Sequence, residues 1–243
     1  NGEIDIIELV NDKKNFKNVL HMCNKCKSRW KKGPKYKSGK TDWGKVTQCQ
    51  GEWGTSGCFS GETYNIKNDK DELPNSKEPE DSEMVTGVGN LFHLDDPSGV
   101  FACWWNPKGS KETIDSKEVD VLGEIRFYYW KYNENNLNQN NGPLSKNPDP
   151  SKWEKDMMTA VQYWKGEGTE TQKACKDNGD ETNCNFNNLK MVFNTTLCGD
   201  WAGNAYAGGK DKCINNIKDT KTILDKKWRI DYVAAFYNNL ENK

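Results

Sequence analysis

The chain has 243 residues, 34% of them hydrophobic, and a net charge of −1 at pH 7. This balance gives no electrostatic reason to expect nucleic acid or an anionic membrane as a partner. The sequence also lacks a run of about 18 apolar residues, the length that a membrane-spanning helix requires. An all-β sandwich of this length is a normal single domain, so we expect residues 1–243 to form one domain.

The first predicted element is a strand at the N-terminus, in which Glu3, Asp5 and Glu8 are interleaved with isoleucines. Isoleucine favours strands. In a regular strand Glu3 and Asp5 share one face and Glu8 points to the other. A β-bulge between Asp5 and Glu8 would reverse this phase and place all three acids on one face. Because neighbouring like charges repel, such a face is costly for a purely structural strand.

Glycoside hydrolysis is one chemistry that uses clustered acids. A retaining enzyme needs an ionised carboxylate as nucleophile and a protonated carboxyl group as proton donor, roughly 5 to 5.5 Å apart. A third acid between them raises the proton affinity of its neighbours. The spacing alone is a weak signal, and a solvated acidic strand without a catalytic role is the alternative.

Further along the chain, short aromatic or β-branched runs alternate with long polar connections, as is typical of a β-sandwich with elaborate loops. Strands are expected at Leu20-His21 and over Ile125–Trp130. The apolar residues of Lys155–Trp164 repeat with helical spacing and predict a short helix. The expected loops and turns are residues 67–82, residues 133–150 and the tight turn Gly199–Gly203.

Nine cysteines indicate an oxidising compartment and therefore a secreted protein. Because the count is odd, either one thiol is free or its partner lies outside this sequence, and we favour the second. The pairs Cys198–Cys213 and Cys175–Cys184 would close short loops, although spacing does not fix connectivity. The sequon at Asn194 predicts an N-glycosylated protein.

Several segments, taken together, carry a resemblance to a known family. They are Gly2–Glu8, Leu20-His21, Gly99–Ala102 with Trp105, Ile125–Trp130, the loop at Trp153, Phe193–Gly203 and Trp228–Ile230. In this order they resemble glycoside hydrolase family sixteen, and within it the laminarinase-like endo-1,3(4)-β-glucanases. The resemblance implies an all-β, concanavalin-like jelly-roll β-sandwich. In that family a long segment precedes the acid motif, so we expect a glycoside hydrolase domain that lacks its N-terminal strands.

The resemblance also implies roles for the acidic residues. Glu3 matches the nucleophile, Asp5 the assisting acid and Glu8 the general acid/base. His21 matches a histidine on the neighbouring strand and would lie close enough to a carboxylate to influence its protonation. A histidine that serves only the sheet is an equally good interpretation of His21.

Aromatic side chains are the candidate sugar-binding groups, because the apolar faces of sugar rings pack well on flat rings. The resemblance points to Trp105, Tyr129 and Trp153. Trp104 and Trp105 are adjacent in an expected strand and therefore face opposite sides. At most one of the two lines a cleft, and a core position is the alternative for either.

The resulting hypothesis is retaining endo-hydrolysis of β-1,3- or mixed β-1,3/1,4-glucan by a secreted, monomeric enzyme. The mechanism requires neither a cofactor nor a metal ion, and the expected partner is the polysaccharide, with no nucleic acid and no membrane. Two alternatives stay open. One is a non-catalytic glucan-binding sandwich, and the other is a cell-wall glucan transglycosylase that passes the same intermediate to a sugar hydroxyl.

Overall fold

The structure of the protein is a computed structural model. It describes residues 3–9, 15–22, 26–34, 43–44, 46–48, 63–65, 99–130, 137–139, 141–166, 184, 186, 189–194, 198–204, 206–218, 230 and 233–236. The predicted loop over residues 67–82 lies outside these ranges.

Antiparallel strands dominate the described residues, with two short α-helices, which confirms the all-β class. The chain divides into two compact units, Asn1–Val192 and Phe193–Lys243. This division does not test the expected single glycoside hydrolase domain, which stays a prediction. Among the described residues, no helix combines the length and apolarity needed to cross a bilayer.

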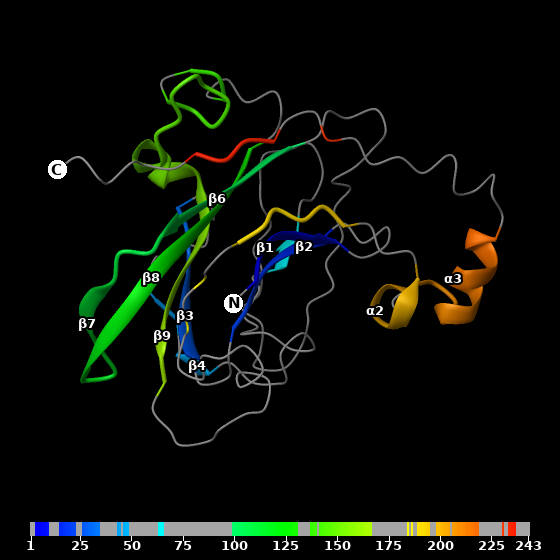
Figure 1. The fold of residues 1–243 in the computed structure, drawn as a ribbon, viewed down its shortest axis with the longest axis horizontal. Helices are drawn as coiled ribbons and strands as arrows, with labels where there is room; N and C mark the ends of the chain where they lie inside the picture. Colours follow the sequence, from blue (N-terminus) through cyan, green and yellow to red (C-terminus); the bar gives the residue numbers. More distant parts are fainter. Residues whose placement is uncertain are drawn as a thin grey trace. The chain divides into compact units, whose positions relative to one another are not determined.

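The first unit contains a small sheet that carries the N-terminal acids. Its strands are β1 (Glu3–Leu9), β2 (Asn15–His21) and β5 (Thr63–Asn65), in the order β1-β2-β5 (Figure 1). Both neighbouring pairs are antiparallel. The small sheet therefore places β2 in the middle, next to the acidic strand.

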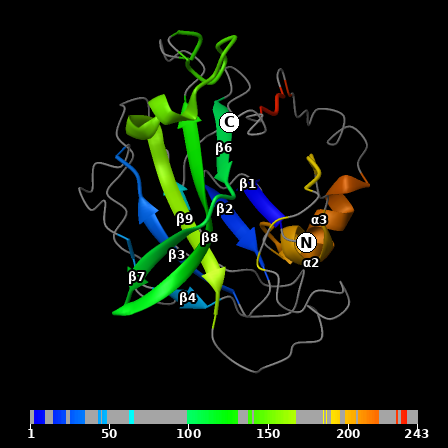
Figure 2. The same ribbon diagram turned by 60° about the vertical axis from the view of Figure 1, so that its left-hand side comes forward.

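A six-stranded sheet forms the larger part of the same unit. Its order is β4-β3-β9-β8-β6, and β7 pairs with β8 (Figure 2). The strands are β3 (Cys26–Lys32), β4 (Thr47–Gln48), β6 (Val100–Asn106), β7 (Ser110–Ile114), β8 (Lys117–Trp130) and β9 (Met157–Lys165). The predicted strand Ile125–Trp130 is confirmed as the end of β8.

The predicted helix over Lys155–Trp164 is wrong. Two 3-10 turns, Pro150–Lys152 and Glu154–Asp156, precede the strand β9, which pairs with β3 on one side and β8 on the other. Every residue of β9 except the last is buried. A strand that is covered on both faces shows no polar alternation, so its apolar residues can imitate helical spacing.

One apolar cluster joins the two sheets of the first unit. It combines side chains of the small sheet with side chains of the six-stranded sheet, with Ile4 packed against its edge. The buried members are Leu20, Met22, Cys26, Trp30, Ile125, Phe127, Val161, Tyr163, Cys184 and Phe186. The small sheet is therefore held against the larger one by its apolar face.

Cysteine pairing differs in part from the prediction. Cys198–Cys213 is confirmed, but Cys184 bonds to Cys26 rather than to Cys175. Cys26 and Cys184 are 158 residues apart, so spacing could not suggest the bond. Cys103 is the free thiol within the described ranges, and burial raises its pKa to about 12.

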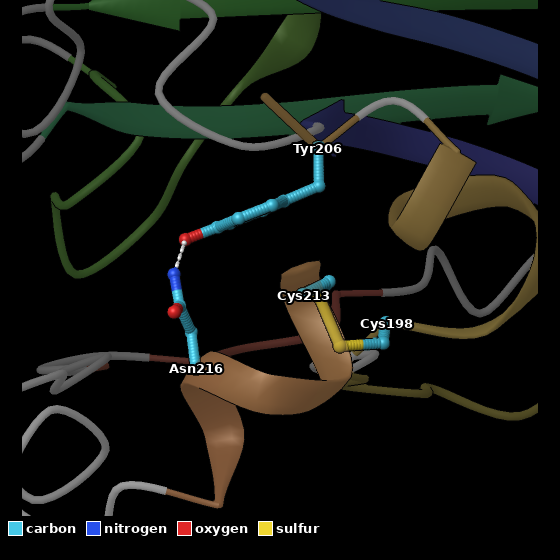
Figure 3. The surroundings of a disulfide bond; sticks show 4 residues. All are labelled: Cys198, Tyr206, Cys213 and Asn216. Atoms are coloured by element: carbon cyan, nitrogen blue, oxygen red, sulfur yellow. Dashed lines mark hydrogen bonds between the residues drawn. A yellow bond between two sulfur atoms is a disulfide. The ribbon is translucent and has the colours of Figure 1, made fainter. Parts of the chain in front are cut away.

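The described residues of the second unit include the helices α2 (Gly199–Asn204) and α3 (Gly209–Ile217), which the Cys198–Cys213 disulfide links (Figure 3). Asn216 Nδ2 donates a hydrogen bond to Tyr206 Oη over 2.9 Å, as Figure 3 shows. The tight turn expected over Gly199–Gly203 is thus a short helix. A bend does precede it, because Cys198 and Gly199 both have positive φ angles.

Candidate active site

The β1–β2 pairing places the acids. Glu3 lies opposite His21 and Asp5 opposite Val19, and the register then shifts so that Glu8 lies opposite Lys17. The two residues between Asp5 and Glu8 therefore face a single residue of β2, which defines a β-bulge. The bulge that the acid spacing suggested is confirmed, at the expected position.

The bulge determines the direction of Glu8. Side chains directly opposite each other in an antiparallel pair leave the sheet on the same side. His21 and Val19 share one face of β2, and the backbone position paired with Glu8 is in phase with them. Their partners on β1 are the three acids, so Glu3, Asp5 and Glu8 all point to this side. Ile4 points to the other side and packs against the core.

Asp5 and His21 form the central contact of the acidic face. His21 Nε2 lies 3.0 Å from Asp5 Oδ2, and both side chains are largely buried. The separation is that of an ion pair. Because both groups are shielded from water, the contact is stronger than it would be on an open surface.

The acids raise the pKa of His21. The first cause is the polar contact with the Asp5 side chain, which outweighs the opposing effect of burial, and the charges of Glu3 and Glu8 add to it. His21 Nδ1 is buried and has no hydrogen-bond partner among the described residues. The acids therefore stabilise the cationic form of His21, and its buried Nδ1 is left without a partner among the described residues.

The pKa of Glu3 is also raised. Burial is the first cause, followed by the charge of Asp5 and a side-chain hydrogen bond with it, whereas the charge of His21 lowers the pKa. Glu3 and Asp5 are two steps apart on one face, so they compete for stabilisation by a single cation. The pKa of Glu3 therefore depends on the charges of both Asp5 and His21.

The same cluster has the donor set of a metal site. Glu3, Asp5 and His21 each offer one ligand atom, and these atoms lie within 4.8 Å of one another. Carboxylate and imidazole ligands suit a divalent cation of the Zn²⁺ or Mn²⁺ type. Exposed acidic groups are common without a metal, and we assign none here.

Trp105 is not brought to the acids. It packs against the same core cluster as Ile4. The Ile4 side chain lies on the opposite side of β1 from Glu3 and Asp5. Its Nε1 donates a hydrogen bond to Tyr163 Oη over 2.9 Å. This placement corresponds to the core alternative, and sugar binding by Trp105 stays a prediction.

Tyr129 and Trp153 are both buried. The centroid of the Tyr129 ring lies 4.9 Å from that of Phe101, its cross-strand neighbour on β6. Trp153 packs edge-on against Tyr128 and Trp130, and its Nε1 donates to the Asn141 carbonyl. Both residues have packing partners in the six-stranded part of the unit, and sugar binding by either stays a prediction.

Sequence reasoning did not identify Asn18. This residue is 2% exposed, lies opposite the bulge, and donates a hydrogen bond from its side chain to the Ile6 carbonyl. The available signal was an asparagine directly before the apolar pair Val19-Leu20 of an expected strand. Such a residue is unfavourable in a regular strand, so it can mark an irregular one.

A scan against protein-family models, a search of curated proteins and a search of solved structures each returned no match.

Proposed function

We propose that this protein is a glycoside hydrolase of family sixteen that cleaves β-1,3- or mixed β-1,3/1,4-glucan internally and with retention. The proposal includes a concanavalin-like jelly-roll arrangement for the strands of the first unit. The antiparallel sheets and their shared apolar cluster are consistent with that arrangement. The disulfides are consistent with secretion into an oxidising compartment.

The observation that carries the proposal is the bulge in β1. A regular strand would direct Glu8 away from Glu3, whereas the bulge directs both glutamates and Asp5 to one side. Irregularities of this kind occur preferentially beside active sites. Three acids on one face are unfavourable for stability, so their placement is best explained by the chemistry that needs them.

Side-chain reach sets a condition on the mechanism. The β2 partners of Glu3 and Glu8 are His21 and Lys17, four residues apart, which corresponds to about 13 Å along the strand. A retaining mechanism needs the two carboxyl groups about 5 to 5.5 Å apart. Each glutamate must therefore lean about 4 Å toward Asp5 when substrate is bound. The length of the glutamate side chain permits this.

The proposed roles follow from the arrangement. Glu8 protonates the glycosidic oxygen while Glu3 attacks the anomeric carbon and forms a glycosyl-enzyme. Glu8 then takes a proton from a water molecule, whose oxygen attacks the anomeric carbon and breaks its bond to Glu3. The sugar leaves, Glu3 is again a carboxylate and Glu8 is again protonated. Asp5 lies between them and, together with His21, adjusts how readily Glu3 loses its proton.

The test is the release of reducing ends from laminarin and lichenan by the wild-type chain and by Glu3→Gln. Glu118→Gln is the matched control, because Glu118 is an exposed acid in the β7–β8 hairpin that pairs with Lys111. We expect release by the wild type and the control and none by Glu3→Gln. An undiminished rate in Glu3→Gln would contradict the proposal.

Two further outcomes would identify the alternative functions. Oligosaccharides longer than the substrate would indicate a transglycosylase. Binding to laminarin that persists in Glu3→Gln and Glu8→Gln, without hydrolysis by the wild type, would indicate a glucan-binding module.

A further inference from the structure

Asn18 occupies the position on β2 that faces two residues of β1 instead of one. The paired residues on either side are Asp5 with Val19 and Glu8 with Lys17. The Asn18 side chain donates a hydrogen bond from Nδ2 to the carbonyl oxygen of Ile6, one of the two bulge residues. This contact therefore lies at the point where the register changes.

The hydrogen bond compensates for a defect of the bulge. An extra residue in one strand disrupts the regular ladder and deprives backbone groups of their usual partners. A buried carbonyl without a donor is unfavourable, so the irregular register needs another source of hydrogen bonds. Asn18 is 2% exposed and supplies a donor that an apolar side chain of the same size lacks.

Asn18 does not face the proposed substrate site. It alternates with Lys17 and Val19, the partners of Glu8 and Asp5, and thus points to the opposite side of the small sheet. Any influence on catalysis must pass through the backbone of β1. Without the bulge the ladder would continue from Asp5 in step, and Glu8 would lie opposite Phe16 and face the core side.

We propose that Asn18 is a positioning residue, which holds the bulge in β1 and thereby keeps Glu8 on the same face as Glu3. For its effect on turnover this inference rests on the proposed function. Its effect on strand register does not depend on that function, and the two are measured separately.

The test variant is Asn18→Leu, which keeps the approximate volume and removes the donor. Asn216→Leu is the matched control, because it removes the same kind of amide donor from a hydrogen bond in the second unit. Ile125→Val is a second control, since it trims a fully buried side chain of β8 and leaves the residues of β1 and β2 unchanged.

The structural measurement is the set of cross-strand nuclear Overhauser effects between β1 and β2 in isotope-labelled protein. The wild type should show Glu8 opposite Lys17. In Asn18→Leu we expect contacts between Ile7 and Lys17 to replace the contacts between Glu8 and Lys17, because a ladder without the bulge pairs Ile7 with Lys17. An unchanged Glu8–Lys17 pairing in the folded variant would overturn the inference, whether or not the chain hydrolyses glucan.

The kinetic measurement separates positioning from general stability. We expect kcat of Asn18→Leu on laminarin to fall about 10- to 100-fold with KM changed less than about twofold, because the proton donor is displaced and the binding surface is not. Both controls should keep the wild-type kcat at a temperature where they are folded. A shifted register with unchanged kcat would refute the link to Glu8.

Should Asn18→Leu fail to fold, the wild type itself supplies the test. The side-chain amide of Asn18 should exchange slowly with solvent and show a scalar coupling across the hydrogen bond to the Ile6 carbonyl. Exchange at the rate of an exposed asparagine, with no such coupling, would refute the proposal.

Discussion

Both sheets of the first unit carry carboxylates, but they surround them differently. On the six-stranded sheet, Glu124 Oε1 lies 2.5 Å from Arg126 Nε, and the same arginine pairs with Glu154. Glu112 pairs with Arg29. Gln162 Nε2 adds a hydrogen bond to Glu112. Each of these acids has an arginine partner, as expected for a structural polar network.

On β1, by contrast, the acids are close to one another. The charge of Asp5 contributes to the raised pKa of Glu3, and His21 contacts Asp5. Acid content alone therefore does not mark a site. What marks this one is a group of acids that a structural irregularity turns to one face and whose charges act on one another.

The largest expected effect separates the two groups of acids by turnover. Glu8→Gln removes the proposed proton donor and should lower kcat on laminarin by about 10²- to 10⁴-fold. Glu124→Gln changes an arginine-paired acid of the other sheet and should leave kcat within about twofold. Steady-state kinetics on both variants decide this, and equal losses would remove the distinction between the sheets.

Losses of stability should be larger in the six-stranded sheet than in β1, which is the reverse of the order expected for losses of turnover. Ile125 is fully buried in the six-stranded sheet, so Ile125→Ala should lower the free energy of unfolding by about 2 to 5 kcal/mol. Ile6 on β1 is 38% exposed, and Ile6→Ala should cost less than about 1 kcal/mol. Urea unfolding measures both. A larger loss at Ile6 would show that β1 contributes more to stability than its exposure suggests.

The pH dependence of turnover should report the acidic face. Glu3 must be ionised to attack, and its raised pKa places the acidic limb of the kcat/KM profile above the usual range of a glutamate. The charge of His21 lowers that pKa. His21→Gln removes the charge and should shift the acidic limb to still higher pH. A shift to lower pH would contradict this electrostatic assignment.

The smallest expected effect is on thermal stability. A carboxyl group whose pKa is raised by folding binds more protons in the folded state, so its ionisation above that pKa weakens folding. Glu3→Gln should therefore raise Tm slightly near pH 7, on the order of 1 °C, because the side chain is exposed and screened. The difference should vanish below the ordinary pKa of glutamate. Calorimetry at both pH values would test the sign.

The features that could be predicted from sequence are local. The strand β1 follows from its alternating isoleucines and acids, because side-chain direction in a strand depends on neighbouring residues. The acid spacing also showed where a bulge would turn all three acids to one face, and the register shifts there. The strand position of Leu20-His21 came from the family resemblance. The Cys198–Cys213 disulfide is also local, because it joins residues only 15 positions apart.

The features that could not be predicted depend on distant partners. β9 is a strand because β3 and β8 flank it, and its own apolar pattern was compatible with a helix. Cys26 and Cys184 meet through the core packing of residues far apart in the chain. The role of Asn18 depends on which carbonyl the bulge exposes, and this appears only when both strands are in place.

Trapping of the covalent intermediate tests the central claim most directly. The chain would be incubated with a 2-deoxy-2-fluoro laminaribiosyl fluoride, digested, and analysed by mass spectrometry. We expect one glycosyl group per chain, attached to the peptide that contains Glu3 and located on that residue. Fluoride release without an adduct, or an adduct on another carboxylate, would contradict the claim that β1 holds the nucleophile of a retaining glycosidase.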